Sequence, residues 1–134
     1  MLRAIVGLAV ALVCVSSCGD EIRPLGPTPA GEGIVIYMHS DFSGPSQAMH
    51  LDAADLRKVE GACSSGAEGE VPTWSECVSS VKVTPGWVAV LYHKANYQGE
   101  NVKLSSDTPN LQSLRGPCKD TFNDCAVSIR VIKQ

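Results

Sequence analysis

An internal repeat constrains the fold of this chain more than any other feature of its sequence. A shift of 55 residues aligns residues 35–37 with 90–92 and needs no gap before Cys63, which falls on Cys118. Seven additional residues then follow in the first copy, within residues 64–73, and the alignment resumes at a shift of 48. The aligned pairs are Phe42 and Tyr97, Gly44 and Gly99, Asp52 and Asp107, Leu56 and Leu111, Gly61 and Gly116, Trp74 and Phe122, and Cys77 and Cys125. The repeat therefore predicts one domain, residues 34–132, built from copies at 34–84 and 87–132.

Each copy opens and closes with a run rich in Val, Ile, Leu and Tyr. These runs are residues 34–38 and 78–83 in the first copy, and residues 88–93 and 126–132 in the second. In the closing runs apolar residues alternate with polar neighbours, which is typical of half-buried strands. The 12 glycines and 8 prolines are scattered through the chain as turn residues, and no long helical pattern occurs. The sequence therefore predicts an all-β fold with two sheets packed as a β-sandwich.

The opening runs share a second signature, Tyr37-x4-Phe42-x-Gly44 in the first copy and Tyr92-x4-Tyr97-x-Gly99 in the second. This pair of motifs resembles the folded hairpin of the βγ-crystallin family. In that family the two aromatic rings pack across a tight hairpin, and the glycine takes a backbone conformation that a Cβ would penalise. The resemblance covers residues 33–132 and implies two Greek-key motifs, with structural roles for the aromatic side chains.

The N-terminal segment resembles an export signal. Arg3 precedes an unbroken apolar run at residues 4–15, which is too short to span a bilayer but suits a signal peptide. Residues 15–18, Val-Ser-Ser-Cys, resemble the lipobox of bacterial lipoproteins. We therefore expect a signal peptide at residues 1–17, a lipid on Cys18 and a flexible, Pro/Gly-rich tether at residues 18–33. Gly19 after the cysteine implies outer-membrane delivery in a Gram-negative host. The alternative is ordinary cleavage near Ser17, which leaves Cys18 as a free thiol.

Four further cysteines lie in the repeated region, and four cysteines allow three pairings. Because the repeat aligns Cys63 with Cys118 and Cys77 with Cys125, one disulfide per copy is the economical arrangement, Cys63–Cys77 and Cys118–Cys125. Export makes disulfides chemically plausible. The alternative is a zinc site of four thiolates, which is disfavoured because no two cysteines are separated by the two residues common between zinc ligands.

The resemblance also raises the question of calcium. Calcium-binding βγ-crystallins carry Asn/Asp-Asn/Asp-x-x-Ser/Thr-Ser before the last strand of each motif. A hydroxyl at the fifth position and a carbonyl at the third come from one motif, and an acidic or amide side chain comes from the other. Here residues 75–80 read Ser-Glu-Cys-Val-Ser-Ser, and residues 123–128 read Asn-Asp-Cys-Ala-Val-Ser.

These departures affect the two possible sites unequally. A site combining Ser79, the Cys77 carbonyl and Asp124 keeps its oxygen ligands, which are the kind Ca²⁺ prefers. The reciprocal site, with Glu76 as the acidic residue, lacks a hydroxyl because Val127 takes the fifth position. We expect one weakened Ca²⁺ site or none. The alternative is that these polar side chains only make turn and cap hydrogen bonds.

Composition and motifs exclude several classes of function. The chain has 11 Lys+Arg against 14 Asp+Glu without runs of like charge, which argues against nucleic-acid binding. Histidines 39, 50 and 93 show no catalytic spacing, and no nucleophile or phosphate-loop motif occurs, so we expect a non-enzyme. The first candidate is a membrane-tethered structural or Ca²⁺-responsive lipoprotein of the cell envelope. The alternatives are a peptidase inhibitor acting through residues 64–73, and an envelope- or carbohydrate-binding lipoprotein using Trp74 and Trp87. The protein or carbohydrate partner is not indicated.

Overall fold

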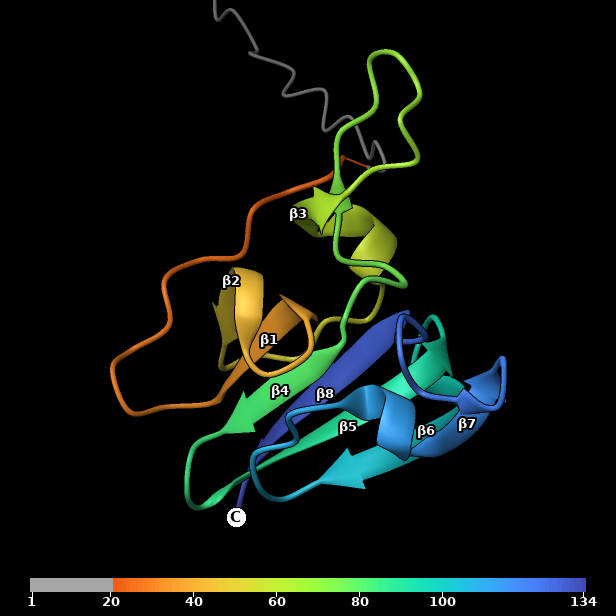
Figure 1. Cartoon of the computed structure of the whole chain (residues 1–134). Helices are drawn as coiled ribbons and strands as arrows, with labels where there is room; N and C mark the ends of the chain where they lie inside the picture. Colours follow the sequence, from red (N-terminus) through yellow and green to blue (C-terminus); the bar gives the residue numbers. More distant parts are fainter. Residues whose placement is uncertain (1–20) are drawn as a thin grey trace, which may run out of the picture.

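The computed structural model describes residues 21–134. The regular secondary structure in that range consists of strands and two short 3₁₀ helices (Figure 1). The elements in chain order are β1 (Ile34–His39), β2 (Ser43–Met49), η1 (Leu56–Lys58), β3 (Glu60–Cys63), β4 (Ser80–Val83), β5 (Trp87–Lys94), β6 (Gln98–Leu104), η2 (Leu111–Ser113), β7 (Arg115–Cys118) and β8 (Ser128–Lys133). No helix in this range is long and apolar enough to cross a lipid bilayer. The predicted all-β fold is confirmed.

Each copy contributes three strands to one antiparallel sheet. The first sheet has the order β2-β1-β4 and the second has the order β6-β5-β8, so the opening strand of each copy is central. In the first sheet Ile36 pairs with Val81, and in the second Leu91 pairs with Ile129. All four of these side chains are fully buried, which explains why the opening and closing runs are the most apolar parts of the repeat.

Each three-stranded sheet is completed by a short segment that comes from the other copy. Ala53, from the first copy, exchanges two backbone hydrogen bonds with Ile129 of β8. Thr108, from the second copy, exchanges two with Val81 of β4. The segment around Ala53 thus completes the second sheet, and the segment around Thr108 completes the first. This exchange makes the domain a pair of interlocked Greek keys and confirms the predicted topology.

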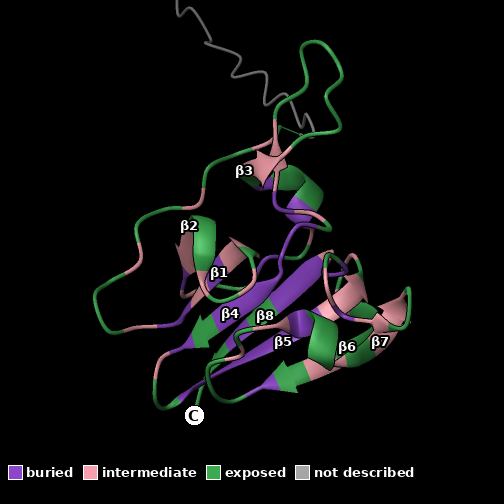
Figure 2. Cartoon of the chain, in the orientation of Figure 1, coloured by how far each residue is buried: buried purple, intermediate pink, exposed green. Residues whose placement is uncertain are grey.

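The core lies between the two sheets and continues under the segments that precede β4 and β8. Figure 2 shows buried residues concentrated along β4, β5 and β8. Trp74 and Phe122 are 2% and 1% exposed, and each ring contacts the glycine that the repeat places before it, Gly61 or Gly116. A Cβ at either glycine would collide with the ring or with the neighbouring backbone. Packing therefore explains why glycine and aromatic positions repeat together.

The two aromatic pairs form the predicted folded hairpins. The ring centroids of Tyr37 and Phe42 lie 5.7 Å apart, and those of Tyr92 and Tyr97 lie 5.8 Å apart, both in edge-to-face geometry. Gly44 and Gly99, on β2 and β6, have φ angles of 75° and 77°, the left-handed region that favours glycine.

A buried serine in each closing strand holds the hairpin of its own copy. The Ser80 hydroxyl donates to the carbonyl of His39 at 2.6 Å and accepts from the N–H of Phe42 at 3.1 Å. In the second copy, the Ser128 hydroxyl makes the equivalent bonds, with Lys94 at 2.5 Å and Tyr97 at 3.0 Å. Both serines are fully buried, so these bonds replace the water that each hydroxyl loses.

The segment before β1 differs from the expected flexible tether. Residues 1–17 and Cys18 lie outside the described residues, but the segment at residues 21–33 begins beside β3 and runs around the outside of β2 to β1 (Figure 1). The N–H of Arg23 donates to Lys58 and its carbonyl accepts from Glu60, both at 2.9 Å, while the Leu25 side chain packs against the core. Backbone pairing and one apolar side chain thus attach a segment whose Pro/Gly composition predicts a free linker.

Candidate calcium site

Two residues of the predicted site meet across the two copies. The Ser79 hydroxyl donates to Oδ1 of Asp124 at 3.0 Å, although 45 residues separate them. Ser79 is 7% exposed, whereas Asp124 is exposed to solvent. The hydroxyl and the carboxylate that the sequence motifs pair across the two copies are thus in direct contact.

Backbone hydrogen bonds place the acidic residues of both motifs in equivalent positions. The N–H of Glu76 donates to the carbonyl of Ala126 at 2.9 Å, and the N–H of Asp124 donates to Val78 at 3.0 Å. Both acidic residues adopt left-handed backbone conformations, with φ of 53° for Glu76 and 50° for Asp124. Asp and Asn adopt this conformation more readily than other non-glycine residues, which accounts for an Asn/Asp preference at this position.

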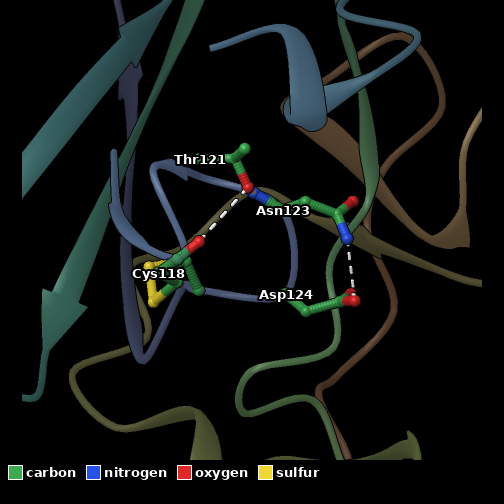
Figure 3. The surroundings of a disulfide bond; sticks show 5 residues. Cys118, Thr121, Asn123 and Asp124 are labelled. Atoms are coloured by element: carbon green, nitrogen blue, oxygen red, sulfur yellow. Dashed lines mark hydrogen bonds between the residues drawn. A yellow bond between two sulfur atoms is a disulfide. The ribbon is translucent and has the colours of Figure 1, made fainter. Parts of the chain in front are cut away.

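The chemistry of the first site fits a Ca²⁺ ion. The Ser79 hydroxyl, the Asp124 carboxylate and backbone carbonyls are all hard oxygen donors. Oδ2 of Asp124 accepts a hydrogen bond from the side-chain amide of Asn123 at 2.8 Å, which orients the carboxylate (Figure 3). These residues would hold the ion together with the carbonyl of Cys77.

A surface cleft beside Asp124 contains groups that sequence reasoning missed. It is lined by Glu76, Gln112, Cys118, Lys119, Thr121, Asn123 and Asp124. Lys119 brings a positive charge into the cleft that Glu76 and Asp124 also line, and a positive charge there disfavours a bound cation. Gln112 and Lys119 lie outside the six-residue motifs, so only the fold reveals that they share the cleft with Asp124.

The reciprocal site lacks the hydroxyl, as the sequence predicts. Val127 occupies the position equivalent to Ser79, because its N–H donates to Tyr92 at 2.8 Å just as the N–H of Ser79 donates to Tyr37 at 2.9 Å. An isopropyl side chain offers no ligand atom to a metal ion. Glu76 therefore has no hydroxyl partner equivalent to Ser79, and the two motifs differ in the ligand atoms that they offer.

The structure contains the two disulfides that the repeat predicts. Cys63 is bonded to Cys77 and Cys118 to Cys125, with Cα–Cα distances of 6.0 and 5.7 Å. A zinc site made of all four thiolates is therefore excluded in this oxidised state.

Comparisons with known proteins relate the chain to crystallins through a sequence relative and through solved structures. No model of a known protein family matches the chain. The chain is 32% identical over 99 residues, 73% of its length, to a γ-crystallin S-2 of Chiloscyllium indicum. Those residues are 45% of that protein, so the chain spans less than half the length of this curated relative.

Solved structures show the same fold. A βγ-crystallin domain from Flavobacterium johnsoniae matches with a TM-score of 0.54 and 25% identity, over 75% of this chain and 94% of that one. The N-terminal domain of Protein S matches with a TM-score of 0.55 and 24% identity, over 75% and 96% of the two chains. A βγ-crystallin domain from Clostridium beijerinckii matches with a TM-score of 0.55 and 19% identity, over 77% and 100%.

The domain has two sheets, and each is completed by a segment from the other copy. Each sheet carries a folded aromatic hairpin that a buried serine closes. These features define a double Greek-key domain of the crystallin type. Residues 34–133 have the fold of a single βγ-crystallin domain, and the sequence is similar to that of a γ-crystallin.

Proposed function

We propose that this protein is a lipid-anchored, non-enzymatic scaffold of the cell envelope that is stabilised by one Ca²⁺ ion. The observation that supports the proposal is the contact between the Ser79 hydroxyl and the Asp124 carboxylate, 3.0 Å apart and contributed by different copies. A cation held there, with the Cys77 carbonyl, joins the two Greek keys. Because Val127 offers no ligand on the opposite side, the expected stoichiometry is one ion per chain.

The expected affinity is modest. Extracellular calcium modules of low charge bind with Kd values of ~0.1–1 mM, and we expect a site with one ligating carboxylate to fall in that range. When bound, Ca²⁺ supplies a divalent charge that neutralises Asp124 and links it to the first copy. Binding to the native state alone stabilises it by about 1.4 kcal/mol when free Ca²⁺ is ten times the Kd.

Calorimetric titration and thermal unfolding with and without a chelator test the site. We expect one Ca²⁺ per chain and a higher Tm in millimolar Ca²⁺, and we expect Asp124→Ala to remove both effects. Asp120→Ala is the matched control, because Asp120 is an exposed acidic residue with positive φ in the neighbouring turn. A Tm that is identical in Ca²⁺ and in chelator shows that the site is inactive, and the domain is then a purely structural scaffold.

The proposed anchor has an independent test. The lipobox-like residues 15–18 imply that Cys18 carries the lipid and that residues 1–17 are removed. We expect Cys18→Ser to move the protein from the membrane fraction to the soluble fraction, and mass spectrometry of the wild type to find a lipidated Cys18. Retention of the variant in membranes contradicts the anchor but leaves the calcium proposal intact.

A second candidate function is peptidase inhibition by the loop at residues 64–73. This loop projects from the domain (Figure 1) and lies between Cys63 and Cys77, which are disulfide-bonded. The Glu70 carboxylate accepts hydrogen bonds from the hydroxyls of Ser64 and Ser65 and from the N–H of Ser65, at 2.6–3.1 Å. These bonds give the loop internal order despite Gly66 and Gly69, and an ordered loop is what a protease cleft requires.

Deletion of residues 64–70 separates the two candidates, because it shortens this loop to the length found in the second copy. Inhibition of a panel of peptidases by the wild type and not by the deletion variant supports the inhibitor function. Equal inhibition by both proteins, or none, rejects it. The third candidate, carbohydrate binding on exposed indoles, receives no support, because Trp74 and Trp87 are 2% and 9% exposed.

A further inference from the structure

The second disulfide has a histidine beside it. One ring nitrogen of His93 and the sulfur atoms of Cys118 and Cys125 all lie within 4.8 Å of one another. The proposed calcium site uses none of these side-chain atoms. Imidazole nitrogen and thiolate sulfur are the ligands of protein zinc sites, so the composition of this cluster is that of a metal site whose two sulfurs are bonded to each other.

A β-bulge lies opposite His93. Tyr92 of β5 pairs with Asn101 and Lys94 pairs with Gln98, so the extra residue of the bulge lies in β6 and His93 is the single β5 residue that faces it. A bulge bends the strands locally and increases their twist. The first copy has the same irregularity, with the extra residue in β2 opposite Met38. The two copies therefore differ here in one ligand: the second carries an imidazole where the first carries a thioether.

Contacts independent of the disulfide hold both cysteines in place. The Thr121 hydroxyl donates to the carbonyl of Cys118 at 3.4 Å, within a tight turn that follows β7 (Figure 3). Cys125 is fully buried, and its neighbours Asp124 and Ala126 make backbone hydrogen bonds to the first copy. Cys118 is half-buried and lines the surface cleft, which gives solutes access to its sulfur. Breaking the S–S bond therefore leaves both sulfurs near His93.

We propose that reduction of the Cys118–Cys125 disulfide converts His93, Cys118 and Cys125 into a zinc site, with water as the fourth ligand. A dithiol reductant supplies both electrons. Its thiolate attacks one cysteine sulfur, the S–S bond breaks, and the other cysteine leaves with the electron pair and takes a proton. The second thiol of the reductant then resolves the mixed disulfide, which releases the second cysteine thiol and the oxidised reductant. Zn²⁺ displaces the two thiol protons, which pass to solvent.

The required movement is small. A tetrahedral Zn²⁺ with bonds of ~2.3 Å to sulfur and ~2.0 Å to nitrogen holds its ligand atoms about 3.5–3.8 Å apart. The three ligand atoms already lie within 4.8 Å of one another, and side-chain rotation is sufficient for the remaining adjustment. The oxidised protein cannot bind the ion, because disulfide sulfur is not a thiolate. The cluster is thus a zinc site that only the reduced protein presents.

Metal binding to the reduced full chain tests this proposal. The protein is reduced anaerobically with a phosphine, freed of the phosphine, and titrated with Co²⁺, whose absorption reports tetrahedral thiolate ligation. Zn²⁺ is then added as a competitor. We expect one equivalent of Co²⁺ to produce the tetrahedral bands and one equivalent of Zn²⁺ to remove them. The oxidised protein should produce no such bands.

Two variants assign the ligands. His93→Met gives the second copy the residue found at this place in the first, and we expect it to weaken Zn²⁺ binding at least about tenfold. Cys118→Ser/Cys125→Ser should abolish the bands, because the first copy, with Cys63 and Cys77, has Met38 in place of the histidine. Equal Zn²⁺ affinity of wild type and His93→Met, bands that persist in the double variant, or loss of the β-sheet circular dichroism on reduction each overturn the proposal. None of these outcomes depends on calcium binding.

Discussion

The carboxylate of Asp52 accepts a hydrogen bond from the backbone N–H of Val131 at 2.7 Å, across 79 residues of sequence. Asp107 makes the equivalent bond with the N–H of Val83 at 2.8 Å. Each aspartate precedes the residue that pairs with the sheet of the other copy, and its side chain extends that pairing by one hydrogen bond. Neither copy can complete its sheet alone, so the two Greek keys should unfold as one cooperative unit.

The first prediction concerns these two aspartates. Asp52→Ala or Asp107→Ala leaves a strand N–H without its charged acceptor, and we expect each to lower the free energy of unfolding by about 1.5–3 kcal/mol. Urea denaturation of the purified domain measures the loss. Asp→Asn at the same positions keeps an acceptor oxygen and should cost less. If the Ala variants are as stable as the wild type, the bond contributes nothing and the interlocking rests on the backbone alone.

The second prediction concerns Ser80, which is fully buried and closes the first hairpin. Ser80→Ala leaves the N–H of Phe42 and the carbonyl of His39 without this partner, and we expect a loss of about 1–3 kcal/mol. Ser128→Ala should behave alike in the second hairpin. Ser105→Ala, at an exposed position, is the control and should change stability by less than about 0.5 kcal/mol. Urea denaturation measures the free energy of unfolding of all three variants. A similar loss in Ser105→Ala would show that the loss does not come from the buried hydroxyls.

The sequence predicts the architecture because duplication makes the structural residues visible. A glycine that contacts a buried ring, an aromatic pair across a hairpin, and a cysteine pair within each copy all recur at constant shifts. Asp52 and Asp107 recur as well, but nothing in the sequence says that each reaches into the other copy. That contact depends on the exchange of segments between sheets, which is a property of the three-dimensional fold.

The candidate site was predictable in part for a similar reason. The motifs before the closing strands identify Ser79 and Asp124 as partners and mark Val127 as a lost ligand. They do not reveal that Lys119 lines the same cleft, or that His93 lies beside a disulfide. The docking of residues 21–33 was also missed, because a bond between Arg23 and the backbone near β3 leaves no periodic pattern in the sequence.

The third prediction concerns pH and the projecting loop. Hydrogen bonds from the Ser65 and Ser64 side chains lower the pKa of Glu70 below its ordinary value of 4.5. A carboxyl with a lowered pKa in the folded state stabilises that state above the ordinary pKa, and the contribution is lost as the pH falls through the lowered value. We therefore expect the loop to lose order under acidic conditions while the rest of the domain stays folded.

Hydrogen exchange of the Ser65 amide, which donates to Glu70, measures this loosening. Protection at Ser65 should decrease below about pH 4.5, after correction for the intrinsic exchange rate. Glu70→Gln should remove that pH dependence, and Glu68→Gln, at an exposed site in the same loop, should leave it intact. A pH dependence that persists in Glu70→Gln would assign it to another group.

The last prediction restores the missing half of the calcium pair. Val127 is related to Ser79 by the backbone, because each N–H bonds to the first aromatic residue of its own hairpin and each carbonyl accepts from the first residue of the 3₁₀ helix in the other copy. Glu76 is in turn related to Asp124 by its positive φ and its bond to the opposite copy. Val127→Ser therefore places a hydroxyl on the Glu76 side, where the wild type has a methyl group.

We expect calorimetric titration of Val127→Ser to find two Ca²⁺ ions per chain where the wild type binds one. Val127→Ala is the matched control, because it removes the same two methyl groups without adding an oxygen, and it should bind one ion. The gain should disappear in Val127→Ser/Glu76→Gln, whereas Asp124→Ala should remove only the original site. A single ion in Val127→Ser would mean that the longer Glu76 side chain cannot take the role of Asp124, and the asymmetry would then lie in both partners of the site.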